Sequence, residues 1–101
     1  MQVGIDIVYI PEFSERFSSG SLQDVFTADE LSHATHIASK AGIFAAKEAY
    51  MKAYGEKCNW QDVWLEYTEV GKPLLKNHHA LETTVSISHE REYAVAVVII
   101  P

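Results

Sequence analysis

The sequence predicts an α+β domain in which an antiparallel sheet packs against one long helix. Three observations lead to this fold class: a proline-free helical run at residues 41–54, β-rich segments at residues 2–8 and 93–100, and turn residues that place further strands in hairpins. No linker, repeat or low-complexity tract divides the 101 residues, so we expect a single domain over residues 1–101 with one shared core.

The first third of the chain is predicted to contain a strand and two short helices. Residues 2–8 alternate weakly and are rich in β-branched side chains, and the turn-former Pro11 ends this strand. A short helix is expected at residues 13–17. Thr27 and Glu30 have capping-box spacing, in which the threonine oxygen and the glutamate carboxylate bind free amides, so a second helix should begin there.

The middle of the chain is predicted to form the long helix and a hairpin. Residues 41–54 are mostly good helix formers, and Gly55 follows directly as a stop signal. Residues 63–68 and 73–76 are expected to be strands joined by a turn at residues 69–72, where a glycine can take positive φ.

The last third is predicted to be a second hairpin. Residues 83–88 alternate and residues 93–100 form an apolar β-rich run, with the turn expected at residues 89–92. Residues 94–100 have no polar face, which indicates that both sides of this strand are covered. Either subunits associate over it, which we favour, or the strand is fully internal in a compact monomer.

Composition excludes several classes of protein. No apolar run approaches the ~20 residues of a membrane helix. The start lacks the basic segment of a secretory signal, so a cytoplasmic location is expected. The net charge of −6 argues against general nucleic-acid binding. The single cysteine, Cys58, cannot form an intrachain disulfide and is expected to be a packing residue.

Acidic residues are the first candidates for chemistry. Asp6 lies in an apolar strand, where its charge needs a partner: a metal ion, or nearby backbone amides or a lysine. Glu48 and Lys52 are four residues apart on the long helix, a spacing most often found in solvated ion pairs. Phe44 shares their face and should turn that side of the helix inward.

Serine and histidine residues offer weaker candidates. Ser86 and Ser88 share one face of a strand that leads to His89, but without a strained turn or an assigned acid they do not indicate a hydrolase. Structural hydroxyls are the better interpretation. The other histidines lack the His-Glu-x-x-His zinc pattern and are expected at the surface; they are His33, His36, His78 and His79.

Taken together, these segments resemble the holo-acyl-carrier-protein synthase family over nearly the whole chain and in the right order. The most specific motif is Phe-x-x-Lys-Glu-Ala-x-x-Lys-Ala at residues 44–53, followed by Ser-x-Ser-His at residues 86–89. The supporting motifs are Gly-Ile-Asp-Ile-Val at residues 4–8, Phe-Thr-Ala-Asp-Glu-Leu at 26–31, Gly-Lys-Pro at 71–73 and Tyr-Ala-Val-Ala at 93–96.

The resemblance implies a 4′-phosphopantetheinyl transferase fold and a magnesium-dependent transfer of phosphopantetheine from coenzyme A to a serine of an apo acyl-carrier protein, a step in lipid biosynthesis. Asp6 and Glu48 would bind Mg²⁺, while Lys47 and Lys52 would contact phosphate oxygens. Lys52 would also assist proton transfer. The second product would be adenosine 3′,5′-bisphosphate.

The family's assembly is a trimer with active sites at subunit junctions, so the resemblance implies a homotrimer here. The nucleotide end of the cleft would be lined by a second set of residues, contributed by the neighbouring subunit. These residues are Gly71, Lys72, Pro73, Ser86, Ser88 and His89.

The chain departs from the family pattern at three places. Ile43 stands where the family usually has an arginine, and residues 56–58 replace a glycine-rich loop. Arg16 is the only basic residue at residues 12–17, where the family commonly has several arginines for an acidic carrier protein. The alternative function is therefore a weakened relative that binds nucleotide or carrier without efficient transfer. Retention of Asp6, Lys47, Glu48 and Lys52 disfavours it.

Overall fold

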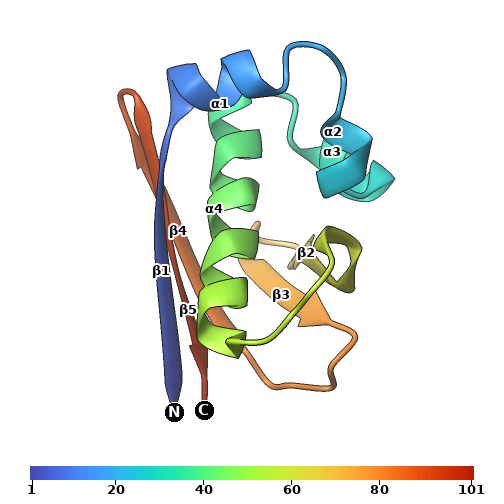
Figure 1. The fold of residues 1–101 in the computed structure, drawn as a ribbon, viewed down its shortest axis with the longest axis vertical. Helices are drawn as coiled ribbons and strands as arrows, with labels where there is room; N and C mark the ends of the chain where they lie inside the picture. The colour runs from blue at the N-terminus through green and yellow to red at the C-terminus, as the bar shows by residue number, and fades with distance from the viewer.

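The computed structural model describes residues 1–101 as five strands, four α-helices and one 3₁₀ helix (Figure 1). The strands are β1 (Gln2–Tyr9), β2 (Val63–Tyr67), β3 (Pro73–Asn77), β4 (Thr84–Glu90) and β5 (Tyr93–Ile100). The helices are α1 (Ile10–Arg16), α2 (Leu22–Val25), α3 (Ala28–His33), α4 (Ile37–Tyr54) and the 3₁₀ helix η1 (Trp60–Asp62). None of the helices combines the length and apolar character that a membrane crossing requires.

Helix α4 lies along one face of a three-stranded antiparallel sheet with the order β1-β5-β4 (Figure 1). The β2–β3 hairpin forms a separate two-stranded sheet on the other side of the helix. Helices α1, α2 and α3 cover the end of α4 that is remote from the two chain termini. The predicted α+β class, with a sheet against a long helix, is thus confirmed.

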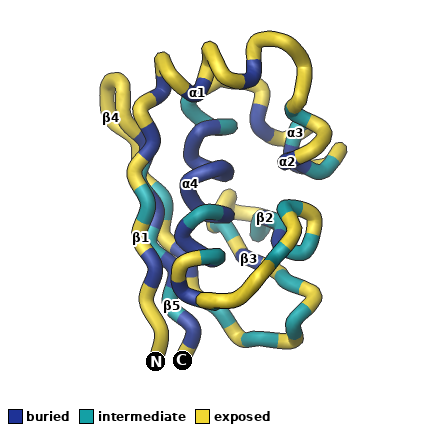
Figure 2. Tube along the Cα trace, viewed as in Figure 1, coloured by how far each residue is buried: buried dark blue, intermediate teal, exposed yellow.

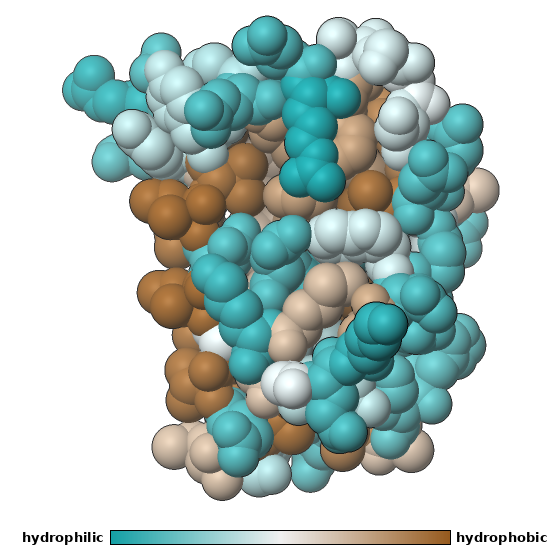
Figure 3. Space-filling model, in the orientation of Figure 1, coloured by the Kyte–Doolittle hydropathy of each residue, from teal (hydrophilic) through white to brown (hydrophobic).

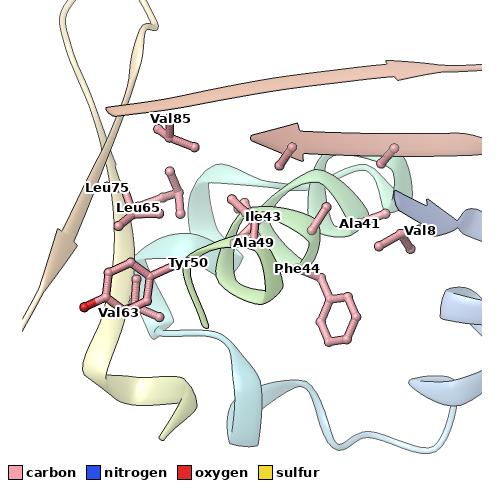
Figure 4. Close-up of a cluster of buried hydrophobic side chains, with 14 of the residues drawn as sticks. Val8, Ala41, Ile43, Phe44, Ala49, Tyr50, Val63, Leu65, Leu75 and Val85 are labelled. Atoms are coloured by element: carbon pink, nitrogen blue, oxygen red, sulfur yellow. The ribbon is translucent and has the colours of Figure 1, made fainter. Parts of the chain in front are cut away.

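The core surrounds α4, which is the most continuously buried element (Figure 2). Alanines at positions 45, 46 and 49 have no exposed surface, and they let the sheet approach the helix closely. Aromatic and branched side chains fill the space between α4 and the hairpin, where Tyr50, Val63, Leu65 and Leu75 meet (Figure 4). Burial on both sides explains why α4 lacks a clear polar face.

Gly4 marks the closest approach of β1 to α4. A Cβ atom at this position would lie 1.9 Å from the carbonyl oxygen of Ala49 and 2.8 Å from the amide nitrogen of Ala53. Both neighbours are helix backbone, which cannot move aside as a flexible side chain could. Glycine is therefore required for β1 to bring its following residues against the helix.

Several predicted boundaries need correction. Helix α1 starts at Ile10, three residues before the predicted start, because Pro11 occupies its first turn, where a missing N–H costs nothing. Helix α4 starts at Ile37 rather than residue 41, without a side-chain cap that could have signalled it. Helix α2 was not predicted. Strand β4 continues through Glu90, so the final turn comprises two residues, with Arg91 at φ 53°.

The outer face of the three-stranded sheet is apolar and largely uncovered. Val3, Ile5 and Ile7 of β1 are 55%, 61% and 65% exposed, and hydrophobic side chains line the edge of the molecule where β1 runs (Figure 3). In β5, residues facing α4 are buried, whereas Val95, Val97 and Ile99 are only half-buried. The alternative of a fully internal last strand in a monomer is therefore wrong. Association of subunits over this face stays a prediction.

Candidate active site

The structure brings Asp6, Glu48 and Lys52 together where β1 crosses α4. Asp6 pairs with Ala96 in the sheet, and Ala96 is buried against the helix, so Asp6 also projects toward α4. Glu48 and Lys52 are one helical turn apart and meet it from the other side. Glu48 and Lys52, whose spacing in the sequence is typical of a solvated ion pair, are thus the residues that α4 contributes to the site.

Lys52 is the partner of Asp6 in the structure. Its Nζ donates to Asp6 Oδ1 and to the carbonyl oxygen of Ile5, each at 2.9 Å. The side chain of Lys52 is 53% exposed and that of Asp6 is 13% exposed. The second carboxylate oxygen of Asp6 forms no such bond, so Asp6 can accept a further cation while Lys52 keeps its contact with Oδ1.

Glu48 has no cationic partner at ion-pair distance, because the two ion pairs of the chain join Lys47 to Glu30 and Lys52 to Asp6. Burial raises the pKa of Glu48 above its ordinary value, and the nearby Asp6 carboxylate raises it further, whereas Lys52 and Arg16 oppose the change. Two carboxylates in one cleft with insufficient positive charge form a site that a divalent cation would stabilise. Oxygen ligands of this kind suit Mg²⁺.

A cleft of about 270 Å³ opens beside these carboxylates. Arg16 of α1 lines it, with its guanidinium 5.1 Å from the ring centre of Phe17 and 5.4 Å from that of Phe44. The sequence suggested Arg16 only as a carrier-docking residue. Its place in the cleft could not be found from spacing, since α1 and α4 meet only in the folded chain.

Lys47 is placed differently from the expectation. Its side chain has no exposed surface, and its Nζ lies 2.8 Å from Glu30 Oε1 while donating to the Val25 carbonyl at 2.7 Å. Burial lowers the pKa of Lys47, and Glu30 opposes this change. A phosphate contact would require this buried ion pair to break, so we leave Lys47 out of the proposed site. It connects α4 to α3 and the end of α2.

Glu30 has three structural tasks, of which the sequence revealed only the helix cap. Its Oε1 accepts from the Thr27 amide at 2.8 Å, and the Thr27 hydroxyl accepts from the Glu30 amide at 3.1 Å, which confirms the predicted capping box. Its Oε2 accepts from the Leu65 amide of β2 at 2.8 Å. The same carboxylate therefore caps α3, binds Lys47 and holds the hairpin.

The other predicted residues lie away from Asp6 in the same chain. Ser86 and Ser88 pair with Val97 and Val95, so they project from the outer face of the sheet, opposite to Asp6. Strand β5 also separates β4 from β1, which places the strand axes roughly 10 Å apart. One chain therefore cannot bring these serines to the carboxylates.

Pro73 and His89 do lie near one another. Both line a depression of about 240 Å³ next to Ile43 and Gly42 of α4. Lys72 lies instead in a separate groove along the hairpin, and Gly71 takes φ 85° in the turn before it. Ile43 is buried, with 1% of its surface exposed, so this position offers no charged contact.

The chain belongs to the 4′-phosphopantetheinyl transferase superfamily, whose model matches residues 2–98. Among similar proteins, a holo-[acyl-carrier-protein] synthase of Campylobacter curvus is 38% identical over 112 residues, which cover 97% of this chain and 98% of that protein. The family expected from the motifs is thereby confirmed.

Solved structures agree with the fold. A holo-[acyl-carrier-protein] synthase of Helicobacter pylori in complex with coenzyme A superposes with a TM-score of 0.88 at 27% identity, over 98% of this chain and 99% of that one. A holo-(acyl-carrier-protein) synthase of Bacillus anthracis, in complex with coenzyme A (3′,5′-ADP), also has a TM-score of 0.88, at 30% identity over 98% and 94% of the two chains.

Proposed function

We propose that this protein transfers the 4′-phosphopantetheine group of coenzyme A to a serine of an apo acyl-carrier protein in a magnesium-dependent reaction. The observation that carries the proposal is the convergence of Asp6 and Glu48 in one cleft, with Lys52 bonded to Asp6, in a chain of the transferase superfamily. Relatives of the same fold crystallised with coenzyme A support this molecule as the donor.

Asp6 and Glu48 are the residues that would hold Mg²⁺. Magnesium prefers a few carboxylate oxygens completed by phosphate and water, and these two acids supply such oxygens beside an open cleft. When bound there, the ion would neutralise charge on the coenzyme A pyrophosphate as its bond breaks.

Residues of this chain would then stabilise the leaving group and assist proton transfer. The carrier serine oxygen attacks the phosphorus next to pantetheine, the pyrophosphate P–O bond breaks, and adenosine 3′,5′-bisphosphate leaves. Lys52, whose side chain is largely exposed, contacts the phosphate oxygens and stabilises the leaving group. The serine proton passes to a water or a carboxylate in the cleft.

We further propose a homotrimer in which each cleft is completed by a neighbouring subunit. The uncovered apolar face of β1 supports association, because exposed contiguous apolar surface of this kind usually marks an interface. The separation of Ser86 and Ser88 from Asp6 within one chain supports a shared site. Lys72, Pro73 and His89 would join these serines at the nucleotide.

Intact-mass analysis of an apo carrier protein incubated with coenzyme A, Mg²⁺ and this protein tests the function. We expect the carrier to gain one phosphopantetheine, and expect Asp6→Ala and Glu48→Ala to reduce the rate at least ~100-fold. No gain with any of several carriers, from a folded protein, would favour the weakened relative, for which the buried Ile43 is the motivating observation.

Subunit complementation tests the shared site. Asp6→Ala and His89→Ala chains are expected to be inactive alone, yet co-expressed chains should recover activity, because some junctions then receive an intact half from each subunit. Failure to recover activity in verified mixed assemblies would refute a site built from two subunits. A monomer in solution would refute the trimer.

A further inference from the structure

A second cluster of metal-ligating side chains lies away from the proposed active site. Cys58 belongs to the loop after α4, Asp62 ends η1, and His79 follows β3. The cysteine sulfur, a carboxylate oxygen of Asp62 and a ring nitrogen of His79 all lie within 4.8 Å of one another, and all three residues are half-buried. Residues from three separate segments thus converge on one point that solvent can reach.

The cluster is distinct from the acidic cleft. His79 bonds to Tyr50, which follows Glu48 by two residues on α4. Two residues on a helix differ by about 200° in direction, so Tyr50 and Glu48 leave nearly opposite sides of α4. Asp6 and Glu48 therefore take no part in this cluster.

Neighbouring groups already orient two of the three side chains. The Tyr50 hydroxyl and His79 Nδ1 are 2.6 Å apart, and the Tyr54 ring stacks on the imidazole with centroids 4.2 Å apart. Because a hydroxyl can accept as well as donate, Nδ1–H can bond to Tyr50 and leave the Nε2 lone pair free. Asp62 Oδ2 accepts from the Asn59 amide at 3.0 Å, which leaves Oδ1 free. Metal ligands are typically held by such outer contacts.

A nucleophilic role for Cys58 fits the surroundings poorly. Burial raises the pKa of the Cys58 thiol, and the nearby Asp62 carboxylate raises it further, with Lys47 opposing. Reactive cysteines have the reverse environment, with a lowered pKa. No second cysteine exists for a disulfide. A bound cation, in contrast, would favour the thiolate beside the carboxylate.

We propose that Cys58, Asp62 and His79 form a binding site for Zn²⁺, with three protein ligands and a fourth position open to water. Thiolate and imidazole ligands select zinc over magnesium, which takes oxygen ligands. Tetrahedral zinc would bring the ligand atoms to roughly 3.3–3.5 Å from one another, so atoms that now lie within 4.8 Å need to close in by at most about 1.5 Å. Their position on loops and at the end of a short helix allows this movement.

Zinc at this site would tie three loops around the end of α4. Cys58 lies in the segment that connects α4 to η1. The metal would make this segment rigid through contacts to η1 and to the β3–β4 connection. The inference stands on these side chains alone and does not depend on the transferase reaction.

Titration of the chelator-treated full-length protein with Co²⁺, followed by absorbance, tests the site. Since Cys58 is the single cysteine, a thiolate-to-cobalt charge-transfer band reports on it alone. We expect one Co²⁺ per chain with this band, displacement of the band by stoichiometric Zn²⁺ but not by excess Mg²⁺, and a higher melting temperature with Zn²⁺. Cys58→Ser should abolish the band.

Matched variants separate this site from adventitious binding. His79→Gln and Asp62→Asn should weaken Co²⁺ at least ~10-fold, whereas His78→Gln, at the adjacent histidine that packs against Trp64, should have no effect. Asp6→Ala should also keep the band. The proposal is overturned if no charge-transfer band forms, if one Co²⁺ bridges two chains, or if His79→Gln, folded by circular dichroism, binds as tightly as the parent.

Discussion

Replacing Lys47 by methionine separates the structural role of this residue from the phosphate-binding role that the family resemblance suggested. Methionine keeps the volume and length of the buried stem and removes only the ammonium group. In the structure, that group forms an ion pair at 2.8 Å with a carboxylate that is equally buried. The perturbation therefore acts on the contacts of one buried ammonium group, which also include the carbonyl oxygens of Val25 and Trp60.

The expected magnitude follows from the groups left without a partner. Loss of Nζ leaves the Val25 carbonyl and Glu30 Oε1 short of a donor, and each buried unsatisfied acceptor costs about 1–3 kcal/mol. Glu30 keeps the amides of Thr27 and Leu65 as donors, which limits the cost. We expect a loss of about 3–5 kcal/mol in the free energy of unfolding, the range typical of a broken buried ion pair.

Urea denaturation monitored by tryptophan fluorescence measures this loss, at one fixed protein concentration because assembly affects apparent stability. Lys52→Met is the matched control on the same helix, since Lys52 forms an exposed ion pair. That variant should change stability by less than about 1 kcal/mol, while reducing transfer strongly. Lys47→Met should show the opposite pattern, in which the main effect is a loss in the free energy of unfolding.

A double variant keeps the test informative if Lys47→Met fails to fold. Lys47→Met combined with Glu30→Gln removes both charges and keeps a side chain that can complete the capping box. The double variant should be more stable than the sum of the single changes predicts by about 1–3 kcal/mol. If Lys47→Met has parental stability yet no transferase activity, Lys47 acts on substrate and the structural reasoning is wrong.

Two further predictions concern Gly4, at the closest approach of β1 to α4, and the carboxylate of Glu48. Gly4→Ala should destabilise the protein by about 3 kcal/mol because its Cβ would meet the Ala49 carbonyl at 1.9 Å. Gln2→Ala, at an exposed position of the same strand, should change the denaturation midpoint little; equal midpoints for the two variants would contradict the close approach. For Glu48, a raised pKa means that its charged form costs stability, so the metal-free protein should lose stability as pH rises through that pKa. Glu48→Gln should remove this slope. Mg²⁺ should raise the parent's melting temperature near about pH 8 and not near about pH 4, because protons compete for the carboxylate; a pH-independent effect of Mg²⁺ would exclude Glu48 as a ligand.

Features decided by nearby residues were predictable from the sequence alone. The capping box of Thr27 and Glu30, the end of α4 at Gly55 and the turn at Gly71 depend on contacts within a few residues, and all three appear in the structure. The fold class and the family also followed from sequence, because the motifs that carry the resemblance occur along the whole chain, and the family model matches residues 2–98.

Features decided by contacts between distant segments required the tertiary structure. The sequence placed Lys47 and Lys52 on the same helix, but only packing of α3 and β2 buries one of them against Glu30 and leaves the other beside Asp6. The convergence of Cys58 with His79 likewise depends on loops that meet around the end of α4. Helical spacing determines the direction of a side chain, whereas its partner depends on which distant segment covers that direction.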